Sequence, residues 1–161
     1  SMKLETWLRL FADRGTPHEV PLVPVRELVA GPAVAVDRAT SLREAARIMR
    51  SRRVSSLLVD HGKAIVTERD ITRAIGAGGH PTETVETVAT AAPIRVDSSL
   101  SVIAAGHVML DEQVRHLVVT MPERWLGIVS MRDVVGFLLE QADRQMAVDP
   151  PVEETSEYWM G

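Results

Sequence analysis

An internal duplication constrains the fold of this chain more than any other feature of its sequence. Residues 36–59 align with residues 96–119 at a constant offset of 60 without a gap, and eight of the 24 aligned pairs are identical. After a three-residue insertion the similarity resumes, with IVTERDI at 65–71 against IVSMRDV at 128–134. Repeats of this kind usually form similar units that bury a shared face against each other. Two such units leave a pseudo-symmetric cleft, where small ligands often bind.

The composition is that of an ordinary globular protein and excludes several classes of function. Hydrophobic residues make up 45% and charged residues 25% of the 161 positions. No window approaches the roughly 20 consecutive apolar residues that span a bilayer, so we expect no membrane contact. The chain has no cysteine, which excludes disulfides, thiol catalysis and cysteine-bound metals. A cytoplasmic location is the default expectation for such a chain.

The distribution of charge suggests where an anion would bind. The net charge of −4 argues against DNA or RNA as the main partner. The half over 25–75 is nevertheless basic, with ten Lys and Arg against six Asp and Glu, so it suits an anion better than the other half. Most of its arginines fit a solvated helix face, but Arg52 or Arg53 is placed to meet a phosphate group.

Periodicity and turn residues predict the same order of elements in both repeats. A proline precedes a short extended stretch, and a serine, Ser41 or Ser99, then caps an Ala-rich amphipathic helix. Two β runs joined by a turn follow and lead directly into a second helix. Each repeat is therefore predicted to be a β-α-β-β-α unit, and the fold class α/β in the α+β sense.

The domain organisation follows from the repeats and the segments outside them. We predict a helix with a Pro-rich connector over 2–23, the first repeat over 24–80, the second over 81–146, and an acidic, poorly ordered tail over 147–161. The N-terminal helix carries four apolar side chains at helical spacing, namely Leu4, Trp7, Leu8 and Phe11. This stripe needs a partner, and packing on its own domain and packing across a dimer fit the sequence equally well.

The motif IV-[TS]-x-R-D ends the second β run of both repeats and is the most informative element chemically. A hydroxyl residue at such a junction is a good N-cap, and helix N-termini attract phosphate. The arginine adds planar donors for the same anion, and the aspartate offers an acceptor for sugar hydroxyls. The predicted ribose-phosphate contacts are Thr67, Arg69 and Asp70 in one repeat and Ser130, Arg132 and Asp133 in the other. The same spacing also describes a capping box, in which the acid only closes the helix start.

These motifs resemble the cystathionine-β-synthase (CBS) domain, and their tandem occurrence over about 24–146 resembles a Bateman module. The resemblance rests on a proline followed by valine, an Ala-rich helix with methionine, an LxVV strand and the junction motif, in that order and twice. It implies a mixed sheet in each half, with the halves packed through their sheets about a pseudo-twofold axis. It also implies clefts that bind AMP, ADP, ATP or S-adenosylmethionine as regulatory ligands, with no required cofactor and a role in energy sensing.

The resemblance assigns candidate contacts as well. The positions that contact phosphate and ribose are Thr67, Asp70, Ser130 and Asp133. The positions expected against the base are Val34, Ser55, Ile94 and Arg115. His116 is a further candidate, either for a phosphate contact or for a response to pH, although an ordinary surface histidine also fits.

The two repeats differ in ways that predict unequal clefts. Ala64 stands where the second repeat has Gly127, and the first hairpin is three residues shorter. The spacing from proline to valine is four residues in the first repeat, at 32–36, and three in the second, at 93–96.

The sequence favours a non-enzymatic regulatory protein. No nucleophile elbow, P-loop or Rossmann fingerprint occurs, and the histidines lack metal-ligand spacing. We expect a homodimer that binds an adenosine-containing ligand between its repeats and changes its dimer contacts, or its contacts with an unidentified regulated protein, in response. The alternative is a ligand-independent interaction module with vestigial clefts, in which both junctions serve only as capping boxes.

Overall fold

The computed structural model describes residues 21–148, so the predicted N-terminal helix and acidic tail lie outside the described residues. The elements before the middle of the chain are η1 (Val25–Leu28), β1 (Ala35–Val36), α2 (Leu42–Arg52), β2 (Ser56–Val59), β3 (Ala64–Thr67) and α3 (Glu68–Gly76). They are followed by η2 (Val85–Thr87), β4 (Thr90–Ala91), β5 (Arg95–Asp97), α4 (Val102–Asp111), β6 (His116–Thr120), β7 (Leu126–Ser130) and α5 (Met131–Val148). Both repeats show the β-α-β-β-α order, which confirms the predicted fold class.

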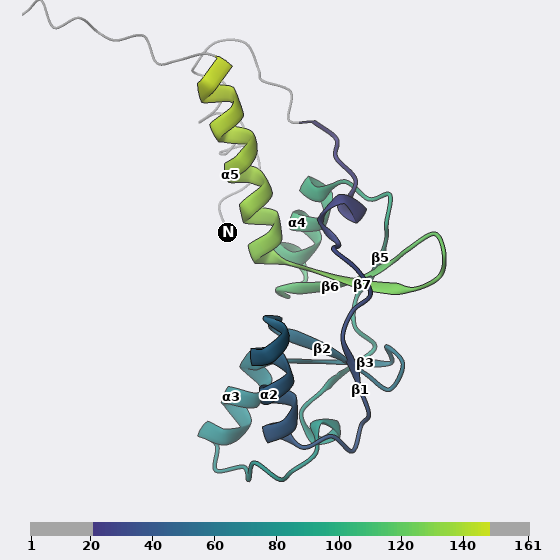
Figure 1. Ribbon diagram of the computed structural model, residues 1–161, viewed down its shortest axis with the longest axis vertical. Helices are drawn as coiled ribbons and strands as arrows, with labels where there is room; N and C mark the ends of the chain where they lie inside the picture. The colour runs from purple at the N-terminus through teal and green to yellow at the C-terminus, as the bar shows by residue number, and fades with distance from the viewer. Residues whose placement is uncertain (1–20, 149–161) are drawn as a thin grey trace, which may run out of the picture.

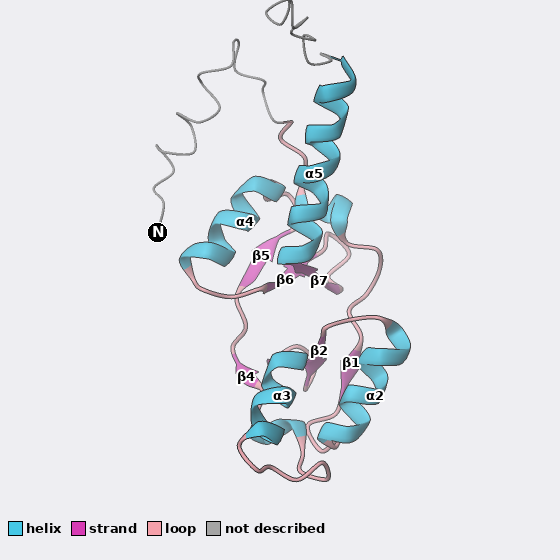
Figure 2. Ribbon diagram, turned by 90° about the vertical axis from the view of Figure 1, so that its left-hand side faces the viewer, coloured by secondary structure: helices cyan, strands magenta, loops and turns pink. Residues whose placement is uncertain are grey.

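The strands form two mixed sheets with the orders β1-β2-β3-β4 and β5-β6-β7. In each repeat the first strand pairs in parallel with the second, and the second pairs antiparallel with the third. The two sheets face each other across the middle of the molecule, with the helices on their outer sides (Figures 1 and 2). Strand β2 is buried along its whole length, as expected for a strand covered on both faces.

Each repeat has its own hydrophobic core, and the two cores are built from equivalent positions. The pairs that the offset of 60 relates are Leu42 and Val102, Ala45 and Ala105, Met49 and Met109, Leu57 and Leu117, and Val59 and Val119. Burial of a Leu, Val or Met side chain stabilises a fold by about 1.5–3 kcal/mol. The duplicated pattern in the sequence is therefore the pattern of the two cores.

The first segment of each repeat, before its β-α-β-β-α unit, crosses over to the opposite repeat. Val25 of η1 belongs to the first repeat but lies fully buried in the core of the second, and its N–H donates to Leu100 O at 2.6 Å. Val85 of η2 belongs to the second repeat but is fully buried in the core of the first, and its N–H donates to Thr40 O at 2.8 Å. Each core is therefore completed by residues from outside its own repeat.

The extended stretches that follow η1 and η2 make a second exchange. The N–H of Ala33 donates to Leu126 O at 2.9 Å, and the N–H of Ala92 donates to Lys63 O at 2.9 Å. Each stretch thereby pairs with the hairpin of the other repeat before it enters its own sheet. These reciprocal contacts join the two repeats into one interlocked unit.

The helix caps confirm one prediction and correct another. Ser41 caps α2, with its Oγ accepting from the N–H of Glu44 at 3.1 Å. The prediction of Ser99 as the cap of the second repeat is wrong. The cap of α4 is Ser101, the equivalent of Ser41, whereas Ser99 binds the Asp97 carboxylate in the turn before it.

Gly127 and Ala64 are equivalent positions, but only at Gly127 does Val29 of the opposite repeat pack where a Cβ would lie. A Cβ on Gly127 would lie 2.4 Å from Val29 Cγ1, which no side-chain carbon tolerates. Val29 belongs to the first repeat, yet it packs on the core of the second. The glycine is thus required by the interlocking of the repeats.

Among residues 21–148 no helix is long and apolar enough to cross a membrane.

Candidate ligand-binding cleft

A cleft of about 1100 Å³ opens between the two repeats. One wall is the extended stretch over 28–34, and the first repeat adds the end of α2 and the starts of β2 and α3. The second repeat contributes His116, Ile128 and the first turn of α5. Both repeats therefore build this cleft, as the pseudo-symmetry predicts.

The cleft brings together seven of the residues that the sequence singled out. They are Val34, Arg53, Ser55, His116, Ser130, Arg132 and Asp133. The other candidates do not line this cleft; they are Thr67, Arg69, Asp70, Ile94 and Arg115. The cleft thus combines the predicted base contacts of the first repeat with the predicted sugar and phosphate contacts of the second.

Ser130 and Asp133 form a reciprocal cap at the start of α5. Asp133 Oδ2 accepts from the Ser130 N–H at 2.7 Å and from the Ser130 hydroxyl at 2.8 Å, while the Asp133 N–H donates to Ser130 Oγ at 3.2 Å. Thr67 and Asp70 make the same three contacts at the start of α3. Both junctions are therefore capping boxes in geometry.

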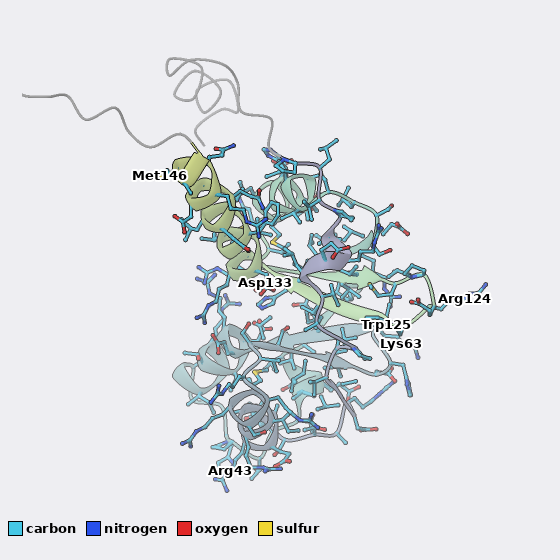
Figure 3. The ribbon with its side chains drawn as sticks, turned by 45° about the horizontal axis from the view of Figure 1, so that its top comes forward. Arg43, Lys63, Arg124, Trp125, Asp133 and Met146 are labelled. Carbon is cyan, nitrogen blue, oxygen red and sulfur yellow. The ribbon has the colours of Figure 1, made fainter. Side chains whose placement is uncertain are left out.

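The capping box at Asp133 does not use the whole carboxylate. All its cap contacts go to Oδ2, and within residues 21–148 no hydrogen bond reaches Oδ1. Asp133 is exposed and lies at the base of α5, where that helix meets the other repeat (Figure 3). One oxygen of Asp133 is consequently available to accept from a hydroxyl group in the cleft.

The charged lining of the cleft favours an anion. Arg50, Arg53 and Arg132 line it against two acidic residues, Glu68 and Asp133, which leaves a small positive excess. The N-terminus of α5 adds its partial positive charge at the same place. Of the two arginines expected near a phosphate, Arg53 lines the cleft and Arg52 does not.

The position of Arg53 follows from the way α2 ends. Arg53 is the C-cap of this helix and adopts a left-handed conformation with φ 55°. Its N–H remains bonded to the last turn, and the chain then turns into β2. The helix end therefore presents Arg50 and Arg53 beside Ser55, a juxtaposition that spacing along the sequence does not reveal.

Apolar residues complete the cleft, and most were missed in the sequence. Met49 and Ile71 match the core pattern of their helices, yet they also line the cleft. Leu28 and Val34 line it from the crossed-over stretch. The sequence of that stretch could have indicated a binding site, because the small residues of AGPAV at 30–34 leave room for a ligand close to the backbone.

His116 joins the two repeats at the cleft. Its Nε2 lies 2.8 Å from Ser55 Oγ, and the ring is half-buried rather than on the open surface. Burial lowers the pKa of His116 below its ordinary value, and nearby Arg115 acts in the same direction. The carboxylates of Asp133, Glu68 and Asp70 oppose this shift of the pKa. The lowered pKa favours the neutral form of the imidazole, which lies among charged groups from both repeats.

Comparison with known families identifies the class of protein. The CBS domain family matches residues 25–77 and 85–140, which is more than half of the chain. This chain belongs to the CBS domain family.

Within the described residues no group of three or more His, Asp or Glu side chains could hold a metal ion.

Two curated plant proteins are similar over most of this chain. The CBS domain-containing proteins CBSCBSPB2 and CBSCBSPB3 of Arabidopsis thaliana are 31% identical over 140 residues and 28% identical over 145 residues. These matches cover 81% and 84% of this chain but 26% of each relative. The chain thus spans about a quarter of the length of these relatives.

Solved structures share the tandem architecture. The CBS domain protein PAE2072 from Pyrobaculum aerophilum, complexed with AMP, is 30% identical, with a TM-score of 0.63 over 75% of this chain and 99% of that one. The CBS-domain protein ATU1752 from Agrobacterium tumefaciens is 25% identical, with a TM-score of 0.64 over 71% and 98%. The CBS domain pair of MJ0100, in complex with 5′-methylthioadenosine and S-adenosyl-L-methionine, is 23% identical, with a TM-score of 0.66 over 75% and 99%. At 23% identity, the similarity to MJ0100 shows that the fold is shared.

Proposed function

We propose that this protein is a non-catalytic regulatory module that binds an adenosine-containing ligand bearing phosphate in the cleft beside Asp133. One observation carries the proposal: the cleft places an apolar wall, an available carboxylate oxygen and three arginines around one space of about 1100 Å³. That volume accommodates a nucleotide, since small-molecule sites typically measure about 300–1000 Å³. The AMP bound by PAE2072, a relative in sequence and fold, supports the choice of ligand.

Each part of the ligand has a matching part of the cleft. The base would lie against Val34 and the apolar side chains that line the cleft with it. The ribose hydroxyls would donate to Oδ1 of Asp133, the oxygen that the cap leaves available. The phosphate would lie between the arginine side chains and the N-terminus of α5, where it gains charge-assisted hydrogen bonds. AMP, ADP and ATP are the preferred candidates, and S-adenosylmethionine would use the same base and ribose contacts without the phosphate.

Regulation would follow from the construction of the cleft by both repeats. A ligand that touches Ser55 in one repeat and Ser130 in the other stabilises the arrangement that brings them together. A coupling of about 1–3 kcal/mol is typical of such population shifts. The response would change the contacts of a homodimer or of a regulated partner protein.

The two equivalent caps provide a matched test. Asp133→Ala and Asp70→Ala each remove the same two carboxylate contacts and keep the third, which the backbone N–H donates, so each should cost about 1 kcal/mol of stability. Calorimetric titration and thermal shift with AMP, ADP, ATP and S-adenosylmethionine would then separate the two roles. We expect Asp133→Ala to weaken binding at least about ten-fold, which corresponds to 1.4 kcal/mol, and Asp70→Ala to leave it unchanged.

The main alternative is an interaction module that binds no ligand, and the capping-box geometry of both junctions favours it. This alternative predicts that both variants lose similar stability and that no nucleotide raises the melting temperature. For a genuine ligand, saturation at about 100 times its Kd should add about 2.7 kcal/mol. Loss of binding in Asp70→Ala together with full binding in Asp133→Ala would show that the ligand occupies the opposite side of the module.

A further inference from the structure

Helix α5 carries an apolar face that the described residues leave largely uncovered. The exposed fractions are 46% for Val135, 40% for Leu138, 61% for Leu139 and 62% for Met146. Together with Ala142 these positions recur at the spacing of one helix face, and we call this face the α5 stripe. Residues on a neighbouring face, Val134 and Phe137, are buried in the core of the second repeat. The helix therefore has one apolar face packed in the core and another that still lacks a partner.

The described chain begins beside α4, the helix that packs against α5. Val23 O accepts from the N–H of Val102 at 2.8 Å, which fixes the start of the described chain at the N-terminus of α4, and α4 packs against α5 through Gly106 and Val134. Both ribbon views show the start of the described chain at the same end of the molecule as the C-terminal half of α5 (Figures 1 and 2). The residues that precede 21 are thus tethered to the neighbour of α5 in the second repeat.

The sequence before residue 21 supplies a matching apolar stripe. Leu4, Trp7, Leu8 and Phe11 share one face of the helix that the spacing predicts. A helix over 2–14 is about 20 Å long, and the α5 stripe over 135–146 measures about 17 Å. The six residues over 15–20 reach up to about 20 Å when extended, which covers the length of the α5 stripe.

We propose that the N-terminal segment, through Leu4, Trp7, Leu8 and Phe11, docks on the α5 stripe of its own chain. The tether gives the segment an effective concentration in the millimolar range, whereas a second copy must be recruited from solution. The first turn of α5 lines the cleft at Asp133 and its far end carries Met146 (Figure 3). The docked segment and the cleft therefore share one continuous helix, so the segment is positioned to report changes at the cleft.

The absence of cysteine from the chain allows a direct cross-linking test. The double variant Leu8→Cys with Leu139→Cys places one thiol in the segment and one in the α5 stripe. Its matched control is Leu8→Cys with Glu140→Cys, since Glu140 is the next residue on the same helix but lies on its charged side, where it binds Arg144. A disulfide forms only when the two Cα atoms come within about 7 Å, so mild oxidation should give about ten-fold more intramolecular disulfide in the first variant. Non-reducing gels and mass spectrometry of the full-length chain, without nucleotide, measure this ratio.

Each outcome decides the proposal. A cross-linked species of monomer mass, absent from the control, supports docking within the chain. A cross-linked species of dimer mass overturns it and assigns the α5 stripe to a second copy. Equal, low cross-linking in both variants also overturns it.

A second measurement covers the case in which the double variants fold poorly. A nitroxide on Leu8→Cys alone should broaden the amide signals of residues 135–146 in the same molecule. In a mixture of nitroxide-bearing unlabelled chains and unmodified isotope-labelled chains, those signals should remain sharp. Broadening in the mixture, or none in either sample, contradicts the proposal.

Discussion

The two strand-to-helix junctions have the same local structure but different surroundings. Thr67 with Asp70 and Ser130 with Asp133 make the same cap contacts, with corresponding distances that differ by no more than about 0.1 Å. Ser130 and Asp133 line the cleft of about 1100 Å³, whereas Thr67 and Asp70 do not. The helix that follows the first junction spans nine residues, whereas α5 spans 18.

This difference shows which properties a short motif determines. The hydroxyl and the aspartate suffice for a cap, because the cap is made within four consecutive residues. A cleft needs residues from the other repeat, and these arrive through the crossed-over stretch and the end of α2. The repeats are therefore equivalent in local structure and different in their relation to ligands.

The largest effects should come from the two cores and should test whether the repeats unfold together. Leu57→Ala and Leu117→Ala each truncate a fully buried side chain at an equivalent position, so each should destabilise the protein by about 2–5 kcal/mol. Because η1 completes the core of the second repeat and η2 completes the core of the first, neither repeat should unfold alone. Both variants should therefore show one cooperative transition in urea, measured by circular dichroism. Leu22→Ala, at a position 85% exposed, serves as the control and should change stability by less than about 0.5 kcal/mol. Two separate transitions would mean that the repeats are independent domains.

A smaller effect should distinguish Gly127 from Ala64. Gly127→Ala forces a Cβ against Val29 and should cost about 1–3 kcal/mol through overpacking. Adding Val29→Ala should recover a large part of that loss, because the two residues are in contact and their effects should not be additive. Ala64→Gly in the first repeat should cost only about 0.5–1 kcal/mol. Urea denaturation of these three variants and of Val29→Ala alone measures these differences, and an unchanged loss in the double variant would refute the contact.

Two residues at equivalent positions of the repeats have a left-handed backbone conformation, and their replacement should have a still smaller effect on stability. Arg53 and Gln113 have φ values of 55° and 56°. Arg53 directly follows α2, whereas Gln113 comes one residue later, after Glu112, the C-cap of α4. Glycine adopts this conformation without the steric cost that other residues bear, so Arg53→Gly and Gln113→Gly should each raise stability by up to about 1 kcal/mol. Only Arg53 lines the cleft, so only Arg53→Gly should also weaken nucleotide binding. Equal binding by both variants would remove Arg53 from the proposed phosphate contacts.

The sequence predicted the parts of this structure that depend on nearby residues. The repeat offset located the strands, the helices and the core positions, because hydrophobic periodicity and burial are linked within each element. The Ser130 and Asp133 contacts were also visible as a motif. The error at Ser99 arose because two serines stood close together and only the repeat alignment favours Ser101.

The missing parts depend on contacts between distant segments. Nothing in the sequence of Val25 or Val29 shows that they pack on the second repeat, because the crossing is a property of chain topology. For the same reason the sequence could not show that Val34 would face Asp133 rather than Asp70 in the cleft. Arg50 and Glu68 were missed because each looks like an ordinary exposed helix residue.

The smallest expected effect concerns a pair of equivalent positions that differ in chemistry, Ser56 and His116. Burial holds the pKa of His116 in the folded protein below its ordinary value of 6.5. As the pH falls below about 6.5, the unfolded chain therefore gains a proton that the folded chain resists, so the folded state loses stability. His116→Gln keeps a polar partner for Ser55 but cannot titrate in this range, so it lacks this loss. We expect the stability of wild type relative to His116→Gln to decrease between about pH 7.5 and about pH 5.5, measured by urea denaturation at each pH. A relative stability that stays constant at the lower pH would show that the carboxylates of Asp133, Glu68 and Asp70 balance burial. An increase would show that they outweigh burial, and that His116 accepts its proton more readily in the folded state.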